Sequence, residues 1–138
     1  MLYRTDFDEN GRKTLCQMDG VNADMLMDIF VQKLAPGDTL TLEEAEKECA
    51  VLLLSGQVTC RRKNPFEKKP YAVHFCRGTK ATVTAIEGSQ ILVQMTDNDR
   101  TWAPEFYHPG NCLYQEFGKG QWNGTGHRIV STMFDLDN

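Results

Sequence analysis

Short stretches in which apolar and polar residues alternate recur along the chain, separated by small turn segments. A period of two places one row of side chains on each face of a strand, so such stretches are typical of half-buried strands. Segment 49–54 differs because it is almost continuously apolar and has the length of a buried strand. The pattern predicts strands over residues 25–34, 39–42, 49–54, 57–61, 71–75, 80–86, 90–96 and 128–134.

Turn residues stand between these predicted strands. They include Asn10-Gly11, Pro36-Gly37, Ser55-Gly56 and Arg77-Gly78. The turn Glu87-Gly88-Ser89 predicts that segments 80–86 and 90–96 pair as a hairpin. Many short strands at a spacing of about 8–12 residues are typical of a β-sandwich or barrel. We therefore expect an all-β fold.

Segment 102–126 departs from the alternating pattern because Gly, Asn, Pro and aromatic residues concentrate in it. Connections of this length in compact domains are usually functional or disordered. We expect a long aromatic and Gly-rich loop within a single domain spanning 1–138, whose barrel covers about 25–134. Its aromatic residues favour an interface over a platform for sugar rings.

Length and charge exclude several classes of function. The 138 residues carry 15 basic and 19 acidic side chains, a net charge of −4, whereas nucleic-acid binders are normally basic. No apolar run approaches the roughly 20 residues of a membrane helix. Residues 1–10 carry three acids and no apolar core, so we expect no secretory signal. These features predict a cytoplasmic protein that binds neither nucleic acid nor membrane.

The five cysteines are scattered, with no CxxC motif, and the three histidines supply no closely spaced ligand pair. A structural zinc site needs such pairs. Reduced thiols buried as small hydrophobic residues are the expected use, and we predict no metal and no cofactor.

The order of turns resembles the cupin barrel. The first cupin motif is G-x5-H-x-H-x3-E-x6-G, and its spacing fits from Gly37 to Gly56. The resemblance implies that the two histidines and the glutamate bind a metal. In this chain the three ligand positions hold Glu43, Ala45 and Cys49.

The second cupin motif, P-x-G-x2-H-x3-N, fits at Cys76-Arg77-Gly78, and its histidine position holds Ala81. The turns are therefore kept, while every metal-binding histidine of the cupin pattern is replaced. A lone Glu43 cannot hold a transition metal beside alanines. The chain resembles a cupin without its metal site.

Finer features resemble the N-terminal half of the 5-deoxy-glucuronate isomerase family of inositol catabolism, which is similar to the 4-deoxy-5-hexosulose-uronate isomerases. They are Leu34-Ala35-Pro36-Gly37, Val51–Gly56, Asn64-Pro65-Phe66 and His127-Arg128-Ile129-Val130. The resemblance covers about Met25 to Phe134. It implies full chains of twice this length with two cupin halves, whose metal ligands belong to the second half.

The family implies a ketol-isomerase, which moves a proton between adjacent carbons through an enediolate and needs a cation and a base. Because no ligand carries over, whether this chain is an enzyme stays open. The leading hypothesis is a metal-free half whose partner half supplies the metal. The alternative is a stand-alone, non-enzymatic cupin that binds a small sugar acid or self-associates. A third hypothesis has Glu43, His74 and His127 converging on a metal.

Four side chains are candidates for ligand binding: His74, His108, Arg128 and Trp102. His74 is either an inward-facing base or a structural histidine, and the structural role is favoured. His108 lies on the predicted long loop, where it either contacts a sugar acid or is solvated. Arg128 either binds a carboxylate bidentately or forms a surface ion pair. No catalytic residue is assigned.

Overall fold

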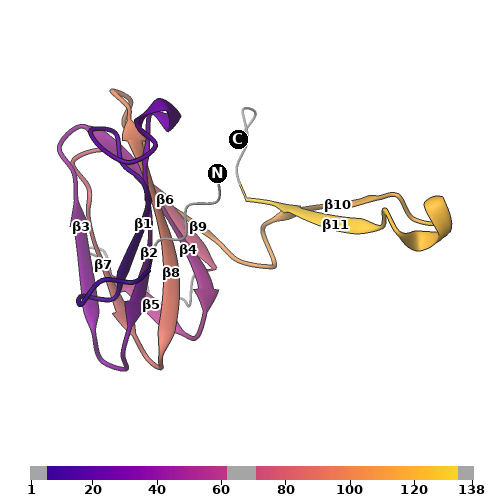
Figure 1. The fold of residues 1–138 in the computed structure, drawn as a ribbon, viewed down its shortest axis with the longest axis horizontal. Coiled ribbons are helices and arrows are strands. Elements are labelled where there is room, and N and C mark those ends of the chain that lie inside the picture. The colour runs from indigo at the N-terminus through magenta and orange to yellow at the C-terminus, as the bar shows by residue number, and fades with distance from the viewer. Residues whose placement is uncertain (1–5, 62–70, 134–138) are drawn as a thin grey trace. The chain divides into compact units, whose positions relative to one another are not determined.

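The structure is a computed structural model that describes residues 6–61 and 71–133. The contacts divide the chain into a first unit, Met1–Phe106, and a second unit, Tyr107–Asn138, which are described separately (Figure 1). The described residues form strands and two short 3₁₀ turns, and no α-helix occurs among them. No helix there could cross a membrane. The Asn64-Pro65-Phe66 motif and Phe134 lie outside these ranges.

The first unit is built from two antiparallel sheets. The three-stranded sheet has the order β3 (Thr39–Glu43), β7 (Lys80–Ala85) and β5 (Val58–Arg61). The larger sheet has six strands, in the order β1 (Arg12–Cys16), β2 (Asp28–Leu34), β8 (Ser89–Asp97), β4 (Lys47–Ser55), β6 (Ala72–Phe75) and β9 (Glu105–Tyr107).

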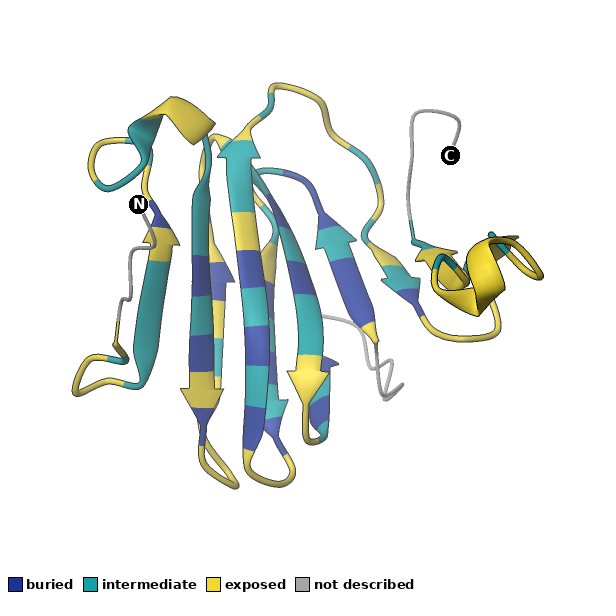
Figure 2. Cartoon of the chain, turned by 45° about the vertical axis from the view of Figure 1, so that its right-hand side comes forward, coloured by how far each residue is buried: buried dark blue, intermediate teal, exposed yellow. Residues whose placement is uncertain are grey.

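The core lies between the two sheets and consists of the inward rows of their strands. Ile91 and Val93 of β8 have no exposed surface. They belong to one cluster with residues of the three-stranded sheet, including Val58 and Val83. From Ser89 to Val93 of β8, buried and half-buried residues alternate, as Figure 2 shows. This arrangement confirms the predicted all-β sandwich.

The predicted hairpin of segments 80–86 and 90–96 is wrong, because β7 and β8 belong to different sheets. The turn between them crosses from one sheet to the other. Ser89 holds this crossing next to the β4–β5 turn: its hydroxyl accepts a hydrogen bond from Gln57 N (3.0 Å) and donates to Glu87 O (2.7 Å).

Two other expectations need correction. The strand predicted over 25–34 begins at Asp28, because the 3₁₀ turn η1 (Ala23–Met25) and a left-handed Leu26 precede it. The segment predicted as a loop, 102–126, contains β9 and β10 (Leu113–Phe117).

The second unit is a β-hairpin. Strand β10 pairs antiparallel with β11 (Arg128–Thr132), and the 3₁₀ turn η2 (Trp122–Gly124) lies in the connection between them. All five residues of β10 are exposed, as are the first four of β11. We call residues 113–132 the arm. Its exposure explains why no alternation of buried positions marks β10 in the sequence.

Asp28 joins three segments at one end of the first unit. Its Oδ2 lies 2.5 Å from Lys47 Nζ of β4, and its Oδ1 accepts a hydrogen bond from Met18 N at 2.8 Å. Partial burial raises the pKa of the Asp28 carboxyl, but the hydrogen bonds from Lys47 and Met18 outweigh it, so the pKa lies below its ordinary value of 3.8.

Because the folded-state pKa of Asp28 is depressed, its stabilising contribution is present above pH 3.8 and is lost as the pH falls through the folded-state value. We predict that Asp28→Asn lowers the free energy of unfolding by about 1.5–3 kcal/mol at neutral pH, the range for hydrogen bonds to charged groups. Urea unfolding at several pH values would measure it. The exposed Asp24→Asn is the control, and a deficit that stays constant into acid would contradict the assignment.

Candidate functional site

The positions that bind metal in the cupin motifs are divided between core and surface in this chain. Cys49 and Ala81 lie in the hydrophobic core and are 1% and 4% exposed. Glu43 lies on the exposed end of β3, where its carboxylate pairs with Lys80 Nζ at 3.2 Å, and Ala45 is exposed. Within the described ranges no group of three or more His, Cys, Asp or Glu side chains could hold a metal ion.

Two of the buried thiols, Cys49 and Cys60, are held in their neutral form by burial. Burial, with smaller contributions from neighbouring acidic groups, raises the pKa of Cys49 far above its ordinary value, and burial raises the pKa of Cys60 to about 11. In the core both side chains are therefore neutral and pack as small hydrophobic groups, and neither has two further His, Cys, Asp or Glu side chains beside it that would complete a metal site in the described ranges. The residues present do not fit a cupin metal centre.

Two of the predicted ligand-binding residues, His74 and Trp102, lie together in the first unit. The neighbours of His74 in β6, Val73 and Phe75, point into the core, so His74 points to the opposite face of its sheet. Its ring centroid lies 5.0 Å from that of Trp102, and its Nε2 lies 3.6 Å from Glu48 Oε2. This position is not that of a base inside the barrel.

The other two predicted residues belong to the second unit. The exposed His108 accepts a hydrogen bond from Gly110 N at its Nδ1 (3.0 Å). The guanidinium of Arg128 lies 5.4 Å from the ring centroid of Phe117. In the same unit His127 Nε2 lies 2.7 Å from Glu116 Oε1, so the three residues of the metal hypothesis, Glu43, His74 and His127, each have a different carboxylate or ammonium partner.

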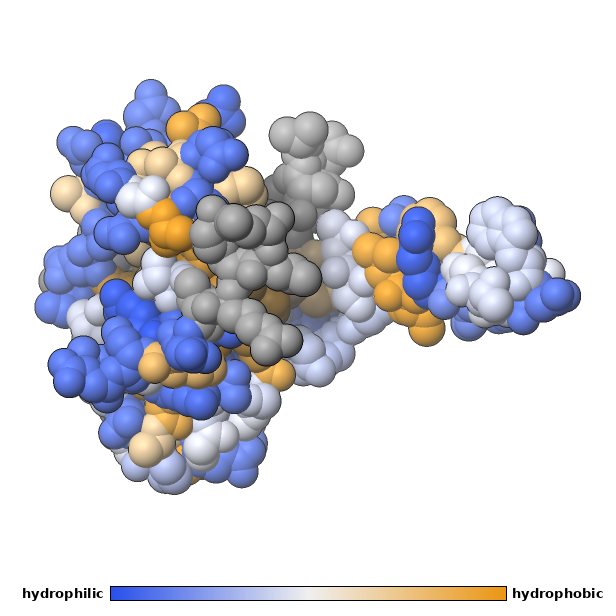
Figure 3. Space-filling view, viewed as in Figure 1, coloured by the Kyte–Doolittle hydropathy of each residue, from blue (hydrophilic) through white to orange (hydrophobic). Residues whose placement is uncertain are grey.

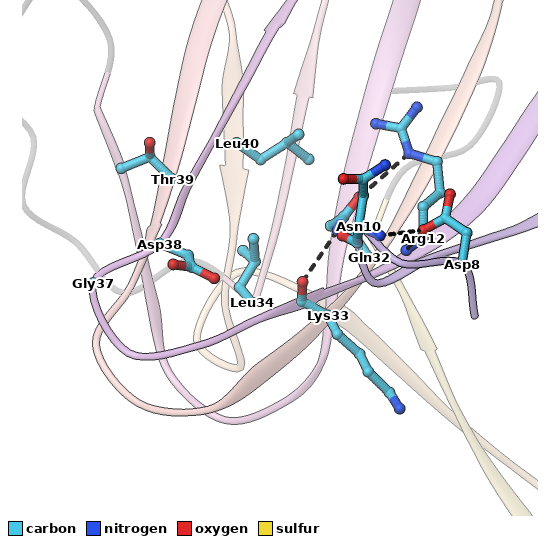
Figure 4. Close-up of a pocket in the computed structure, with 10 residues that line it drawn as sticks. All are labelled: Asp8, Asn10, Arg12, Gln32, Lys33, Leu34, Gly37, Asp38, Thr39 and Leu40. Atoms are coloured by element: carbon cyan, nitrogen blue, oxygen red, sulfur yellow. Dashed lines mark hydrogen bonds between the residues drawn. The ribbon is translucent and has the colours of Figure 1, made fainter.

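A cavity of about 730 Å³ lies in the first unit, where the start of β1 and the end of β2 face the start of β3 (Figure 4). Its volume falls within the range of about 300–1,000 Å³ that is typical of small-molecule sites. The turn before β1 contributes Asp8 and Asn10 to the wall, and the β2–β3 turn contributes Asp38.

One cation in this wall, Arg12, is held at two points. Its guanidinium carbon lies 4.0 Å from the ring centroid of Phe30, and its Nε donates a hydrogen bond to Gln32 Oε1 at 3.3 Å. Gln32 is itself only 6% exposed, and its Nε2 donates to Asn10 O at 2.8 Å. The buried amide therefore fixes both the turn and the arginine.

Two carboxylates share the cavity with Arg12. Asp8 Oδ1 accepts hydrogen bonds from Asn10 N (2.9 Å) and Arg12 N (2.8 Å). Asp38 Oδ2 accepts one from Ala35 N at 2.9 Å. Each side chain is oriented by its own turn.

Sequence reasoning identified the Asn10-Gly11 turn but missed this cavity. One signal was available: Gln32 interrupts the apolar row that Phe30 and Leu34 continue on β2. A polar residue in an inward row needs hydrogen-bond partners, and here those partners form the cavity wall.

Comparison with known proteins gives one family and one fold. The sequence profile of the KduI/IolB family matches residues 1–138. No curated protein matches the chain. An IolB-like protein from Salmonella typhimurium LT2 is 19% identical with a TM-score of 0.79; the similarity covers 95% of this chain and 52% of that one. This chain therefore spans about half the length of that structure.

Two further solved structures are more distant. Protein Ylba from E. coli is 10% identical with a TM-score of 0.62, over 81% of this chain and 51% of that one. A cupin 2 domain-containing protein from Halorhodospira halophila is 19% identical with a TM-score of 0.54, over 75% and 73%. At these identities the similarity shows the fold, which is the predicted cupin fold.

The burial of the thiols yields a labelling prediction. Four cysteines are buried and Cys112 is half-buried, so a thiol reagent should label about one group per native chain and all five after unfolding. Labelling quantified by mass spectrometry measures this, with Cys112→Ser as the control that removes the native signal. Rapid native labelling of Cys49 or Cys60 would contradict a closed core.

Proposed function

The chain belongs to the KduI/IolB family, and from this membership we propose that it is a metal-free cupin half of a sugar-acid ketol-isomerase. The proposed substrate class is 5-deoxy-glucuronate, from inositol catabolism. On this proposal the chain contributes structure and ligand contacts and has no isomerase activity alone.

The observation that carries the proposal is the chemistry of the core at the cupin metal positions. Cys49 and Ala81 are buried among apolar side chains, and burial keeps the Cys49 thiol protonated. A ketol-isomerase needs a cation to stabilise the enediolate oxygen and a positioned base. The core side chains at Cys49 and Ala81 offer neither.

The length comparison supports a partner that completes the protein. The chain spans 52% of the IolB-like structure, to which 95% of its own residues are similar. A second cupin half carrying the metal ligands is the partner that this proposal requires.

Metal content and turnover test the proposal together. After incubation with Mn²⁺, Zn²⁺ or Fe²⁺ and desalting, we predict no stoichiometric metal, measured by inductively coupled plasma mass spectrometry. We also predict no turnover of 5-deoxy-glucuronate by the chain alone. A full equivalent of bound metal, or turnover that a chelator abolishes, would overturn the proposal.

A second candidate function is that of a stand-alone cupin that self-associates, and the exposed surface of the arm favours it. The register of β10 and β11 places Leu113, Phe117 and Val130 on one face of the hairpin and Tyr114 and Ile129 on the other. All five are exposed, and Figure 3 shows apolar residues gathered on this hairpin. A two-stranded hairpin is at best marginally stable by itself in water, so a second copy that covers these apolar side chains would stabilise the arm.

The connection of the arm presents a further aromatic residue. Trp122 is 72% exposed and adopts a left-handed φ of 47°. Its ring packs against Gly126 so closely that a Cβ added to this glycine would lie 2.5 Å from Cε3 of the tryptophan. Exposed tryptophans often dominate the binding energy of protein interfaces.

Sizing chromatography coupled to light scattering tests this second function. We predict that the chain alone forms a dimer and that Ile129→Asp combined with Trp122→Ala shifts it towards the monomer. Leu54→Asp removes an exposed apolar side chain of the first unit and is the matched control. A monomeric wild-type chain at all concentrations would contradict self-association through the arm.

A further inference from the structure

We propose that the cavity beside β1 and β3 binds a small polyhydroxylated acid, with Arg12 receiving its carboxylate. No predicted ligand-binding residue lines this cavity, so the inference assigns a separate site. It rests on the proposed function only in choosing a sugar acid as the ligand. The chemistry of the cavity stands without it.

Arg12 holds its guanidinium in a fixed position, and its two terminal nitrogens have no side-chain acceptor in the described part of the chain. Its position is set by Phe30 below the guanidinium and by Gln32 at Nε. No side chain among residues 6–61 and 71–133 accepts a hydrogen bond from its two terminal nitrogens. A guanidinium that is already held in place loses little conformational entropy when a ligand binds. Its planar geometry allows two parallel hydrogen bonds to one carboxylate.

The carboxylates of Asp8 and Asp38, which line the same cavity, are hydrogen-bond acceptors. Asp8 and Asp38 each have one carboxylate oxygen engaged by backbone N–H groups. The second oxygen of each has no hydrogen-bond partner in the described part of the chain. Ionised carboxylates only accept hydrogen bonds, so they bind hydroxyl groups and repel anions.

The combination of one guanidinium with two carboxylates decides which class of ligand fits the cavity. A small anion such as phosphate would pair with Arg12 but would bring too few hydroxyl groups to donate hydrogen bonds to both Asp8 and Asp38. A neutral sugar would satisfy the aspartates and leave the guanidinium without its charge partner. A hydroxy acid satisfies both sets, and the side chains of Leu34 and Leu40 in the wall offer apolar surface to its carbon chain.

Lys33 does not change this selection, although it belongs to the wall. Its ammonium lies 3.9 Å from the ring centroid of Phe7, and in Figure 4 its side chain points away from the other residues. The carbonyl oxygen of Lys33 accepts a hydrogen bond from Gln32 Nε2 at 3.1 Å. Of the two cations among the described residues of the wall, Arg12 is therefore the one that a ligand would meet.

Titration of the full chain with D-glucuronate, D-glucose and inorganic phosphate, followed by NMR, tests the proposal. We expect glucuronate to bind more tightly than either of the other two and to shift the signals of Arg12, Gln32 and Thr39. Its affinity should fall as the salt concentration rises, because the ion pair is partly exposed. Equal affinity for glucose, or tighter binding of phosphate, would overturn the assignment.

Variants separate a binding role from a structural one. Arg12→Gln should weaken glucuronate binding by about tenfold or more, because a charge-assisted bidentate contact is lost. Arg12→Lys keeps the charge but not the bidentate geometry, so its affinity for glucuronate should lie between those of Arg12→Gln and the wild-type chain. Arg100→Gln, an exposed arginine outside the cavity, is the control for net charge. Unchanged affinity in Arg12→Gln would overturn the proposal.

A second variant keeps the test informative if Arg12→Gln does not fold. The exposed Thr39 lines the cavity on β3, and Thr39→Trp would occupy the space while leaving Arg12 in place. We expect it to abolish glucuronate binding without lowering the melting temperature. Absence of glucuronate binding to a wild-type chain that remains metal-free and inactive would refute this site while leaving the proposed function intact. Metal uptake by the chain together with glucuronate binding that depends on Arg12 would refute the proposed function while supporting this site.

Discussion

Burial of the inward side-chain rows between two sheets is the constraint on which the first unit depends. Ile91 and Val93 have no exposed surface, and Cys49 and Ala81 belong to the same core. Each fully buried Val or Ile contributes about 1.5–3 kcal/mol, so these rows supply a large part of the stability. In this chain the cupin metal positions at Cys49 and Ala81 have become part of that packing. The ligand site that we propose lies instead at the edge of the sandwich, in the cavity beside β1 and β3.

The polar wall of this cavity depends on one polar residue, Gln32, that stands in an apolar row of β2. Gln32 takes an inward position on β2, and its amide must then be satisfied. It is satisfied by Asn10 and Arg12, which brings the first turn and the guanidinium to the cavity. A local requirement for hydrogen bonds thus orients the arginine to which the proposed ligand would bind.

The sequence predicted most of the first unit because alternation records burial directly. The strands near 39–42, 49–54 and 90–96 lie within one or two residues of their expected ends. The hairpin of 80–86 and 90–96 failed because a turn dipeptide does not say whether its two strands pair or cross between sheets. Strand β10 was missed because all its residues are exposed. Its sequence therefore has no alternation of apolar and polar residues from which a strand could be predicted.

The candidate site could be predicted less well than the fold. Replacement of the cupin metal ligands was visible in the motif spacing, and the burial of Cys49 and Ala81 agrees with it. The contacts of Arg12 were not visible, because they depend on the register that places Arg12 opposite Gln32. Contacts between residues 20 positions apart require the pairing of strands, which a local pattern does not contain.

The central claim is that ligand binding occurs at the Arg12 edge while the core stays closed and free of metal. A crystal structure of the chain grown with glucuronate and Mn²⁺ tests it most directly. The account predicts ligand density with its carboxylate on Arg12 and only protein atoms between Cys49 and Ala81. Ligand or metal density between those two residues, with the Arg12 cavity empty, would contradict it.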